Sequence, residues 1–286
     1  MAIVLDNITY TYGVGTPFEK TALRGVSLTI ENGEFLGVIG HTGSGKSTFV
    51  QHLNGLLHPT TGTVTVNGVD ISASTEEAKK MRHKVGMVFQ YPEHQLFEET
   101  IAQDIAFGPK NLGLSADDVD ERVRDAMKFV GLDYDTYAER SPFHLSGGQM
   151  RRVAIAGVVA MDPDFLVLDE PSAGLDPFGR EEIFEEIIRL HKEKGITVIL
   201  VSHNMEDISR MASRLVVLDK GRIVLDGEPM DIFNNHRDEL QAVGVDVPPV
   251  SVTMEYLREQ GFDVSNRVLS VDDAVQAILE GGSHVK

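Results

Sequence analysis

The sequence has 286 residues and lacks cysteine entirely. That absence excludes a disulfide framework, a thiolate metal site and a cysteine nucleophile. No apolar run approaches the ~18 residues that a membrane-spanning helix requires. The longest runs, such as residues 35–40 and 196–201, have the length of strands. The first residues also lack the basic and apolar segments of a secretion signal, so we expect a cytoplasmic protein.

Positive charge is scarce as well. The chain carries 26 Lys and Arg against 44 Asp and Glu, for a net charge of −18. Proteins that bind nucleic acid or anionic lipid need clustered Lys and Arg, so we expect no nucleic-acid partner. An acidic docking face would suit a basic protein partner, and the cytoplasmic loops of membrane proteins are rich in Lys and Arg.

Short apolar segments alternate with helical patterns after an antiparallel-looking start, which indicates a parallel α/β core. The expected strands are residues 3–12, 23–30, 35–39, 63–66, 85–89, 165–168, 197–201, 215–218 and 223–225. The expected core helices are residues 46–57, 150–160, 179–194 and 205–212. A mainly helical pattern over residues 101–161 indicates an insertion into that core. After about residue 235 the character changes, with a linker at 246–250 and short helices at 252–260 and 271–279.

The strand at residues 35–39 runs into a glycine-rich loop that fits the pattern G-x-x-x-x-G-K-[ST]. The loop and the residue after it are Gly40, His41, Thr42, Gly43, Ser44, Gly45, Lys46, Ser47 and Thr48. Glycines let backbone N–H groups turn toward phosphate oxygens, and the helix N-terminus adds partial positive charge. We therefore expect an ATP site in which Lys46 bridges the β- and γ-phosphates and Ser47 binds Mg²⁺.

A second apolar strand, at residues 165–168, ends in two carboxylates. Asp169 at a strand end can hold Mg²⁺ through water. Glu170 is then placed to polarise the attacking water as a general base. Side chains alternate along a strand, so the pair shares one site only if the strand ends there, and Pro171 favours that ending.

The segment Leu145-Ser146-Gly147-Gly148-Gln149 opens a helix, with Ser146 as the expected N-cap. A helix start with two bare glycines exposes N–H groups and is a second anion site. One chain needs only one phosphate loop per nucleotide, so this second site suggests a nucleotide clamped between two copies of such a domain. In isolation a glycine turn before a helix is the simpler interpretation, but the other two motifs reverse that preference.

Together these motifs resemble the nucleotide-binding subunit of an ATP-binding cassette (ABC) transporter, over residues 1 to about 235. The resemblance implies an α/β fold, with a phosphate-loop NTPase core and an antiparallel β subdomain. It also implies a helical insertion subdomain at about residues 100–161 and a small, mainly helical C-terminal extension at 236–286. In that family, the residues that would cap the ATP of a partner subunit are Ser146, Gly147, Gly148 and Gln149.

The remaining family motifs follow in the expected order. By resemblance, Gln90 contacts Mg²⁺ and senses a transmembrane partner, residues 172–176 couple the two ATP sites, and His203 contacts the γ-phosphate. Tyr12 matches the aromatic residue that stacks on adenine, with Tyr10 as the alternative. The implied catalytic set is Lys46, Gln90, Glu170 and His203, and the implied Mg²⁺ set is Ser47, Gln90 and Asp169.

Flanking segments narrow the resemblance to the ATPases of energy-coupling factor (ECF) transporters. They are residues 40–43, 51–56, 91–97, 105–108, 140–143, 151–156 and 247–249. That family implies the ATPase motor of an importer of vitamins or transition-metal ions, peripheral on the cytoplasmic face of the cell membrane. Its partners would be a second ATPase subunit, identical or merely similar, a transmembrane coupling protein and a substrate-binding membrane protein.

Two alternatives stay open. The chain could be the ATPase of another kind of ABC transporter, or a non-transport ABC ATPase that acts on nucleic acid or ribosomes. The latter proteins usually carry long coiled-coil insertions or two cassettes in one chain, and this sequence shows neither.

An acidic cluster follows Gln90. We hypothesise that Glu93, Glu98 and Glu99 receive basic residues from the cytoplasmic helices of the transmembrane partner. A solvated acidic loop explains the same residues equally well.

Overall fold

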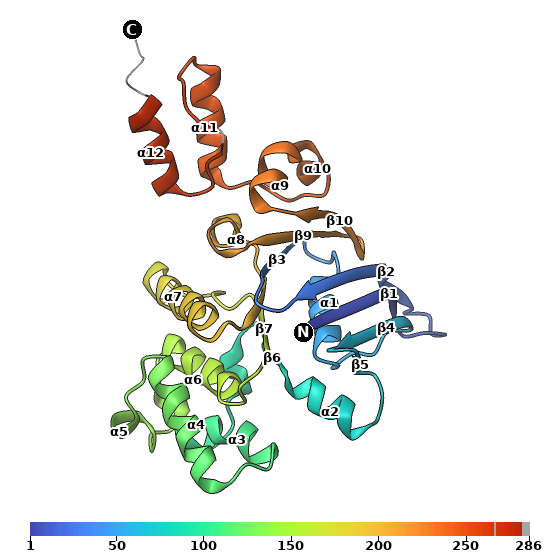
Figure 1. Ribbon diagram of the computed structural model, residues 1–286, viewed down its shortest axis with the longest axis vertical. Coiled ribbons are helices and arrows are strands. Elements are labelled where there is room, and N and C mark those ends of the chain that lie inside the picture. Colours follow the sequence, from blue (N-terminus) through green and yellow to red (C-terminus); the bar gives the residue numbers. More distant parts are fainter. Residues whose placement is uncertain (266, 282–286) are drawn as a thin grey trace.

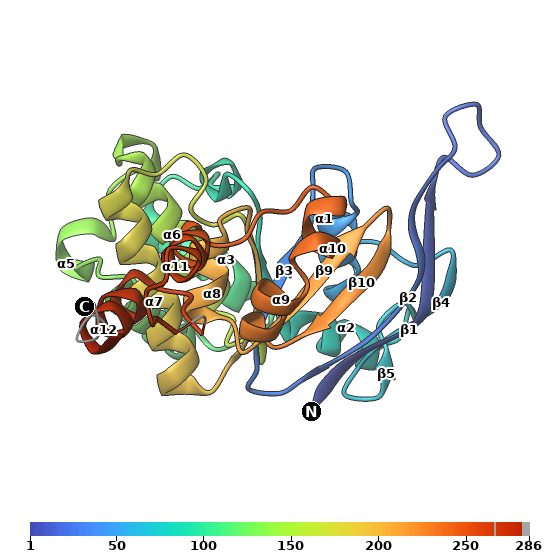
Figure 2. The ribbon, with the colours of Figure 1, turned by 90° about the horizontal axis from the view of Figure 1, so that it is seen from above.

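The computed structural model describes residues 1–265 and 267–281. A six-stranded sheet forms the centre of the molecule. A four-stranded antiparallel sheet and a group of helices lie on opposite sides of it (Figures 1 and 2). Within the described residues, no helix combines the length and the apolar character that crossing a membrane demands.

The central sheet has the strand order β10-β9-β3-β8-β7-β6. Its strands are β3 (Phe35–Ile39), β6 (Val85–Val88), β7 (Phe165–Asp169), β8 (Thr197–Val201), β9 (Arg214–Asp219) and β10 (Arg222–Gly227). All pairs are parallel except β9 with β10. Every residue of β3, β6, β7 and β8 is buried, which explains why these segments read as continuous apolar runs.

The antiparallel sheet has the order β2-β1-β4-β5. Its strands are β1 (Ala2–Tyr12), β2 (Lys20–Glu31), β4 (Thr61–Val66) and β5 (Val69–Asp70). One face packs toward the central sheet, so buried residues such as Ile3 and Leu5 alternate with more exposed ones. In Figure 2 the loop between β1 and β2 extends away from the rest of the molecule.

The helices divide by position in the chain. The core and insertion helices are α1 (Lys46–Leu53), α2 (Glu76–His83), α3 (Ile101–Asn111), α4 (Ala116–Phe129), α5 (Tyr134–Tyr137) and α6 (Gly147–Val159), with short 3₁₀ turns η1 (Pro92–Gln95) and η2 (Pro142–His144). The later helices are α7 (Pro177–Lys194), α8 (Met205–Met211), α9 (Pro229–Asn235), α10 (Arg237–Ala242), α11 (Pro249–Glu259) and α12 (Val271–Gly281). Helices α3 to α6 gather at one end of the molecule, away from the antiparallel sheet (Figure 1).

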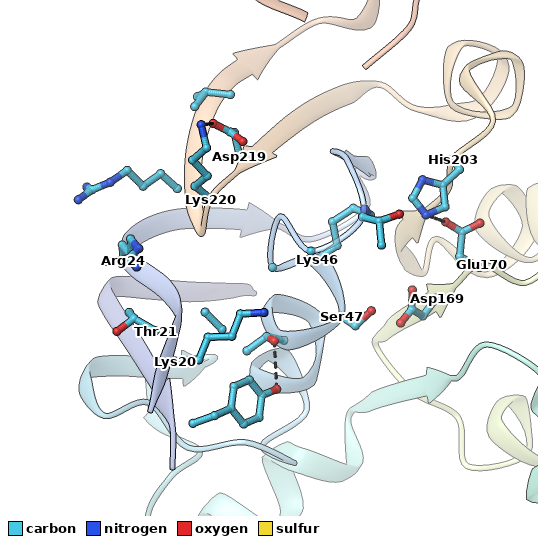
Figure 3. A pocket seen from close by; sticks show the side chains of 18 of the residues that line it. Lys20, Thr21, Arg24, Lys46, Ser47, Asp169, Glu170, His203, Asp219 and Lys220 are labelled. Atoms are coloured by element: carbon cyan, nitrogen blue, oxygen red, sulfur yellow. Dashed lines mark hydrogen bonds and ion pairs between the residues drawn. The ribbon is translucent and has the colours of Figure 1, made fainter. Parts of the chain in front are cut away.

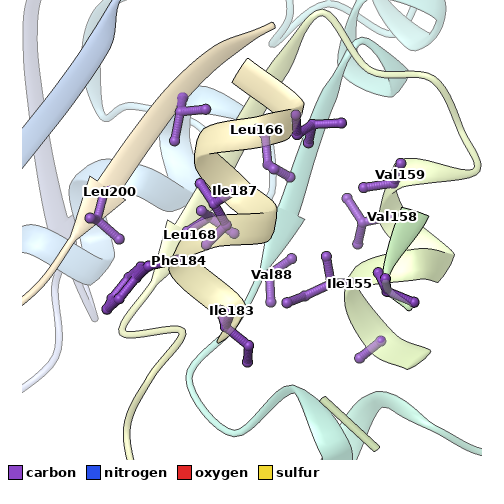
Figure 4. Close-up of a cluster of buried hydrophobic side chains, with 14 of the residues drawn as sticks. Val88, Ile155, Val158, Val159, Leu166, Leu168, Ile183, Phe184, Ile187 and Leu200 are labelled. Atoms are coloured by element: carbon purple, nitrogen blue, oxygen red, sulfur yellow. The ribbon is translucent and has the colours of Figure 1, made fainter. Parts of the chain in front are cut away.

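The two faces of the central sheet support separate apolar clusters. On β7, Phe165 and Val167 join the cluster that includes α1 and the antiparallel sheet. Leu166 and Leu168 join the cluster with α6 and α7 on the opposite face (Figure 4). Successive side chains of a strand point to opposite faces, so one five-residue strand serves both clusters. Each fully buried leucine stabilises the fold by about 2 kcal/mol through removal of apolar surface from water.

The last two helices form a small cluster of their own. Met254, Val264, Val268 and Ala274 are buried together, with the Ser251 hydroxyl donating to the Val268 carbonyl at 2.9 Å. The cluster is attached to the body because Ser209 Oγ donates to the Leu269 carbonyl at 3.1 Å and Leu269 packs into the main core.

The predicted α/β fold with an antiparallel β subdomain is confirmed, and the strands expected at residues 35–39 and 197–201 have those bounds. The patterns missed α2, α9, α10 and β5. The expected division at residue 235 stays a prediction. In the structure, Leu240 and Val245 still pack in the main core.

Candidate active site

A cavity of about 900 Å³ opens where the carboxyl ends of the central strands face the antiparallel sheet (Figure 3). Parallel strands bring the residues that follow them to one edge of a sheet, which is where α/β proteins bind ligands. The predicted site residues that line the cavity are Tyr12, Thr42, Gly43, Gly45, Lys46, Ser47, Thr48, Gln90, Asp169, Glu170 and His203. Gly40, His41 and Ser44 belong to the same loop but do not line the cavity.

The loop between β3 and α1 is shaped by glycines that no other residue could replace. Gly40 has φ +152°, and a Cβ there would lie 2.3 Å from the Leu218 carbonyl oxygen. Gly45 has φ +110°, and its Cβ would lie 2.8 Å from the Ala22 carbonyl oxygen. The loop can therefore take this path only because other backbone segments occupy the space where side chains would stand.

His41 fastens this loop to the end of β9. Its Nε2 lies 2.9 Å from Asp219 Oδ1, and its Nδ1 lies 2.7 Å from the Thr42 carbonyl oxygen. The sequence placed His41 among the ATP-binding residues. In the structure both ring nitrogens are engaged by these contacts, and the assignment of His41 to ATP binding stays a prediction.

Lys46 is buried beneath the loop. Its ammonium donates to the carbonyl oxygens of Gly40 at 2.5 Å and His41 at 3.1 Å. Burial lowers the pKa of Lys46, while Glu170 and Asp169 act to raise it. A desolvated ammonium beside a glycine-rich loop is the arrangement that a phosphate chain would satisfy.

Three oxygen-bearing side chains meet at the end of α1 nearest β7. Ser47 lies beside the Asp169 carboxylate and favours its ionised form, and Gln90 lines the same cavity. Burial raises the pKa of Asp169, and the Ser47 and Lys46 contacts lower it. Hydroxyl, amide and carboxylate oxygens are the ligands that Mg²⁺ accepts alongside phosphate oxygens, so the donor set fits this ion.

Glu170 follows Asp169 in a left-handed conformation, with φ +53°. Its amide donates to the Val201 carbonyl at 3.0 Å, which holds the turn against β8. Burial is the main cause that raises the Glu170 pKa from 4.5 to about 7, and the neighbouring Asp169 charge adds to it. A carboxylate with that pKa in a cavity is matched to general-base chemistry near neutral pH.

His203 lies beside Glu170 (Figure 3). Its Nε2 is 3.2 Å from Glu170 Oε1, a close contact that lacks hydrogen-bond alignment. Burial and the Lys46 charge lower the pKa of His203, so the ring is favoured in its neutral form. The two side chains reach the cavity from the ends of adjacent strands, β7 and β8.

Ser146 to Gln149 lie elsewhere. They line a separate cavity of about 570 Å³, together with Gly174, Leu175 and Asp176. Ser146 Oγ accepts from the Gln149 amide at 3.3 Å, and Gln149 Oε1 accepts from the Ser146 amide at 3.1 Å, so a reciprocal capping box closes the start of α6. Within this chain, the segment does not reach the cavity of Lys46.

The two glycines of this helix start have no role in the fold of their own chain. A Cβ on Gly147 would meet no atom within 4 Å. A Cβ on Gly148 would only reach Leu175 Cδ2 at 4.0 Å, and neither glycine has a positive φ. Alanine would be the better helix former at both positions. The packing of this chain therefore leaves the backbone at both glycines uncovered.

Tyr12 and Tyr10 differ in their surroundings. Tyr12 lines the cavity, is 41% exposed, and its hydroxyl lies 3.1 Å from Thr48 Oγ1. Tyr10 packs against the apolar cluster and His52, and burial raises its pKa. The position of Tyr12 is the one suited to stacking on a base.

The acidic segment after Gln90 is more structured than the sequence suggested. Glu93 Oε2 lies 3.2 Å from Nη2 of Arg151, which is buried in α6. Beside it, exposed Phe97 packs edge-on against Phe107, and both line an apolar groove of about 350 Å³. The sequence interpretation missed this aromatic pair, because an isolated Phe in a helical pattern resembles a core residue.

Basic residues at the cavity were missed as well. Lys20, Arg24, Lys220 and Arg222 all line it, although they fall in no recognised motif. Lys20 and Arg24 come from β2, Lys220 comes from the turn between β9 and β10, and Arg222 is the first residue of β10. Only the fold brings these distant segments together.

Comparison with known proteins gives consistent matches. A family model described as "ABC transporter" matches residues 23–173. The chain is similar to the energy-coupling factor transporter ATP-binding protein EcfA2 of Clostridium tetani, with 54% identity over 98% of this chain and 97% of that protein. It is also similar to EcfA2 of Clostridium perfringens, with 52% identity and 98% of each chain covered.

Two solved structures show related folds. CbiO1 from Clostridium perfringens, part of the ABC transporter complex cbiONQ, has 36% identity and a TM-score of 0.74 over 88% of this chain and 98% of that one. The ATP-binding cassette MJ0796, in a dimeric post-hydrolysis state bound to ADP and Pi, has 30% identity and a TM-score of 0.70. That match covers 79% of this chain and 98% of the other.

Proposed function

The chain belongs to the ATP-binding subunits of ECF transporters, within the ABC transporter family, and from that premise we propose that it drives uptake of a vitamin or a transition-metal ion. ATP binding closes two such subunits on each other, and hydrolysis lets them separate. The motion passes to a transmembrane coupling protein and so to a substrate-binding membrane protein. The chain acts at the cytoplasmic face of the membrane.

One observation carries the two-subunit part of this proposal. The capping segment at Ser146–Gln149 lies outside the cavity that holds Lys46, and its glycines are unnecessary to their own chain. A helix start with exposed N–H groups is an anion site. An anion that this segment cannot reach in its own chain is available on a partner. The dimeric state of MJ0796 supports the same arrangement.

The cavity residues then have distinct roles. Lys46 and the loop amides bind the β- and γ-phosphates, and Tyr12 stacks on the adenine. Ser47, Asp169 and Gln90 would hold Mg²⁺, which when bound neutralises charge on the phosphates.

Glu170 performs the proton transfer. It accepts a proton from water as the water oxygen bonds to the γ-phosphorus and the bond to the bridging oxygen of ADP breaks. His203 orients Glu170 and contacts the γ-phosphate from the end of β8. The raised pKa of Glu170 supports this role, because its carboxylate is a stronger base than an exposed one.

The coupling surface is proposed at the segment after Gln90. Glu98 and Glu99 remain candidates for basic partner residues, and the groove at Phe97 and Phe107 offers apolar contact. Glu93 is less available, since its carboxylate pairs with Arg151.

Substitution of Glu170 with Gln tests the central proposal. The variant should bind MgATP, lose nearly all hydrolysis and accumulate as a closed dimer, because the γ-phosphate persists between the subunits. Size-exclusion chromatography with light scattering measures the dimer, for the chain alone and with any ATPase subunit that co-purifies. Normal turnover by Glu170→Gln would refute the base assignment. If Glu170→Gln with MgATP stays monomeric in both preparations, the two-subunit site would be refuted.

A further inference from the structure

We propose that Lys20, Arg24, Lys220 and Arg222 form a cationic rim that attracts the nucleotide and holds its phosphate chain from the adenine side. This inference rests on the proposed nucleotide cavity and adds binding residues that no phosphate-loop motif includes. Figure 3 shows Lys20, Arg24 and Lys220 at one end of the cavity, and Asp169, Glu170 and His203 at the other.

The rim is held rigidly beside the phosphate loop. The Arg24 amide donates to the Gly221 carbonyl at 2.8 Å, which joins β2 to the turn between β9 and β10. The Gly221 amide donates to the Ser44 carbonyl at 2.8 Å, which joins that turn to the loop. A Cβ on Gly221 would lie 2.3 Å from the Ala22 carbonyl oxygen, so the three segments pack backbone to backbone. The rim therefore keeps a fixed position relative to the loop amides.

Three of the four rim charges have no carboxylate partner among the described residues of a strongly acidic chain. Across the described residues, Lys20, Arg24 and Arg222 form no ion pair, and Lys220 only approaches Asp219 at 3.7 Å. Among the described residues, nine arginines outside the rim form ion pairs, whereas Arg82, Arg140 and Arg258 do not and lie away from the cavity. The paired ones are Arg122, Arg124, Arg151, Arg152, Arg180, Arg189, Arg210, Arg214 and Arg237. A chain of net charge −18 has carboxylates to spare, so unpaired cations that face one cavity indicate an anionic ligand.

The distribution of charge within the cavity gives the ligand an orientation. Asp169 and Glu170 occupy the end where Mg²⁺ and water are needed, and Asp219 is already engaged by His41. The rim supplies the opposite end, beside Tyr12 and exposed Val224. A triphosphate therefore enters with its base between Tyr12 and the rim and its terminal phosphate toward Glu170. Contacts at the rim concern the α- and β-phosphates, so MgADP and MgATP benefit alike.

Neutralising the rim in pairs tests the proposal. The variants are Lys20→Gln/Arg24→Gln and Lys220→Gln/Arg222→Gln in the full chain, with a fluorescent MgADP analogue as probe. Each pair should raise the MgADP Kd about tenfold at low salt, since two exposed charges are lost from the site. The difference should shrink toward about twofold near 1 M salt, where exposed charges are screened.

Two control variants separate the effect of the rim charges from an effect of total charge and from an effect of misfolding. Lys192→Gln/Lys194→Gln removes the same charge at the far end of α7 and should leave the Kd unchanged. Arg222→Lys keeps the charge in a different shape and should bind nearly as the parent does. Rim variants with the parent's Kd and salt dependence would overturn the proposal. The nucleotide cavity itself would fail separately, if Lys46→Ala bound MgADP like the parent.

Discussion

At the scale of single residues, Glu170 has two features that lower the stability of the fold and suit a catalytic role. Its backbone has φ +53°, a conformation that non-glycine residues seldom adopt. Its carboxyl is buried, and its pKa stands at about 7 instead of 4.5. Strain and a desolvated acid both cost folding free energy, and such features persist where function requires them.

The nucleotide-free protein should therefore become more stable when Glu170 is replaced by Gln. The folded-state pKa exceeds the unfolded one, so the stability that protonated Glu170 contributes is fully present below pH 4.5 and is lost as the pH rises through about 7. Glutamine does not ionise, so the advantage of Glu170→Gln should be small at acid pH and approach about 3 kcal/mol above neutrality. Urea denaturation at a series of pH values measures this. An advantage that stays constant or falls with pH would contradict it.

Residue by residue, the site divides into a part that the sequence could predict and a part that it could not. Lys46, Ser47, Asp169 and Glu170 sit in short local motifs, because their chemistry requires fixed spacing along one turn or strand end. The cationic rim has no such spacing. Arg24 and Arg222 are far apart in the chain, and any strand on a protein surface carries similar residues.

At the scale of elements, α6 shows how a helix start can be built for another molecule. The capping box satisfies the amides of Ser146 and Gln149 within the chain. Gly147 and Gly148 then leave backbone uncovered on the outer face. Helix α6 is therefore capped within its own chain, and the backbone of Gly147 and Gly148 is left open to contact with the proposed partner subunit.

Replacing Gly148 with Ala should separate folding from function. The Cβ has room, and alanine favours helix by about 1 kcal/mol, so thermal stability should be equal or higher. ATP hydrolysis should fall at least about tenfold, because a methyl group on the capping surface holds off the partner's phosphate. Differential scanning calorimetry and phosphate release measure the two properties. MgADP binding serves as the control and should not change. Full activity in a stable variant would argue against a capping role.

Elements that the sequence missed share a physical cause. Helix α2 buries only Ala78, so it lacks the apolar periodicity that identifies a helix. Its start is set by Thr75, whose side chain accepts from the Ala78 amide at 3.1 Å. The long buried strands were found because burial on both faces leaves a continuous apolar run.

At the scale of the whole molecule, helices α11 and α12 form a C-terminal hairpin that is attached to the body but folds around its own apolar cluster. Met254 and Val268 are nearly inaccessible within it, whereas Leu279 on its outer face is 68% exposed. Its attachment to the body includes the apolar contacts of Leu269 with the main core and the hydrogen bond from Ser209.

Removal of residues 249–286 should therefore leave a folded cassette. The main core loses Leu269 and little else, so the melting temperature should drop by only about 5 °C. MgADP affinity should stay the same, because no residue that lines the cavity lies beyond Val224. Calorimetry and nucleotide titration of the shortened chain measure both. Loss of cooperative unfolding would show that the hairpin is an integral part of the core.

The free space at Gly148 has a consequence for living cells. Quality control recognises misfolded chains, and a substitution that the fold tolerates gives it nothing to recognise. The Gly148→Ala chain would therefore accumulate to normal abundance and assemble with parent subunits. In the proposed two-subunit assembly, a variant chain that pairs with a parent chain would slow hydrolysis at a shared ATP site, so the variant would also lower transport by the parent chains that it joins.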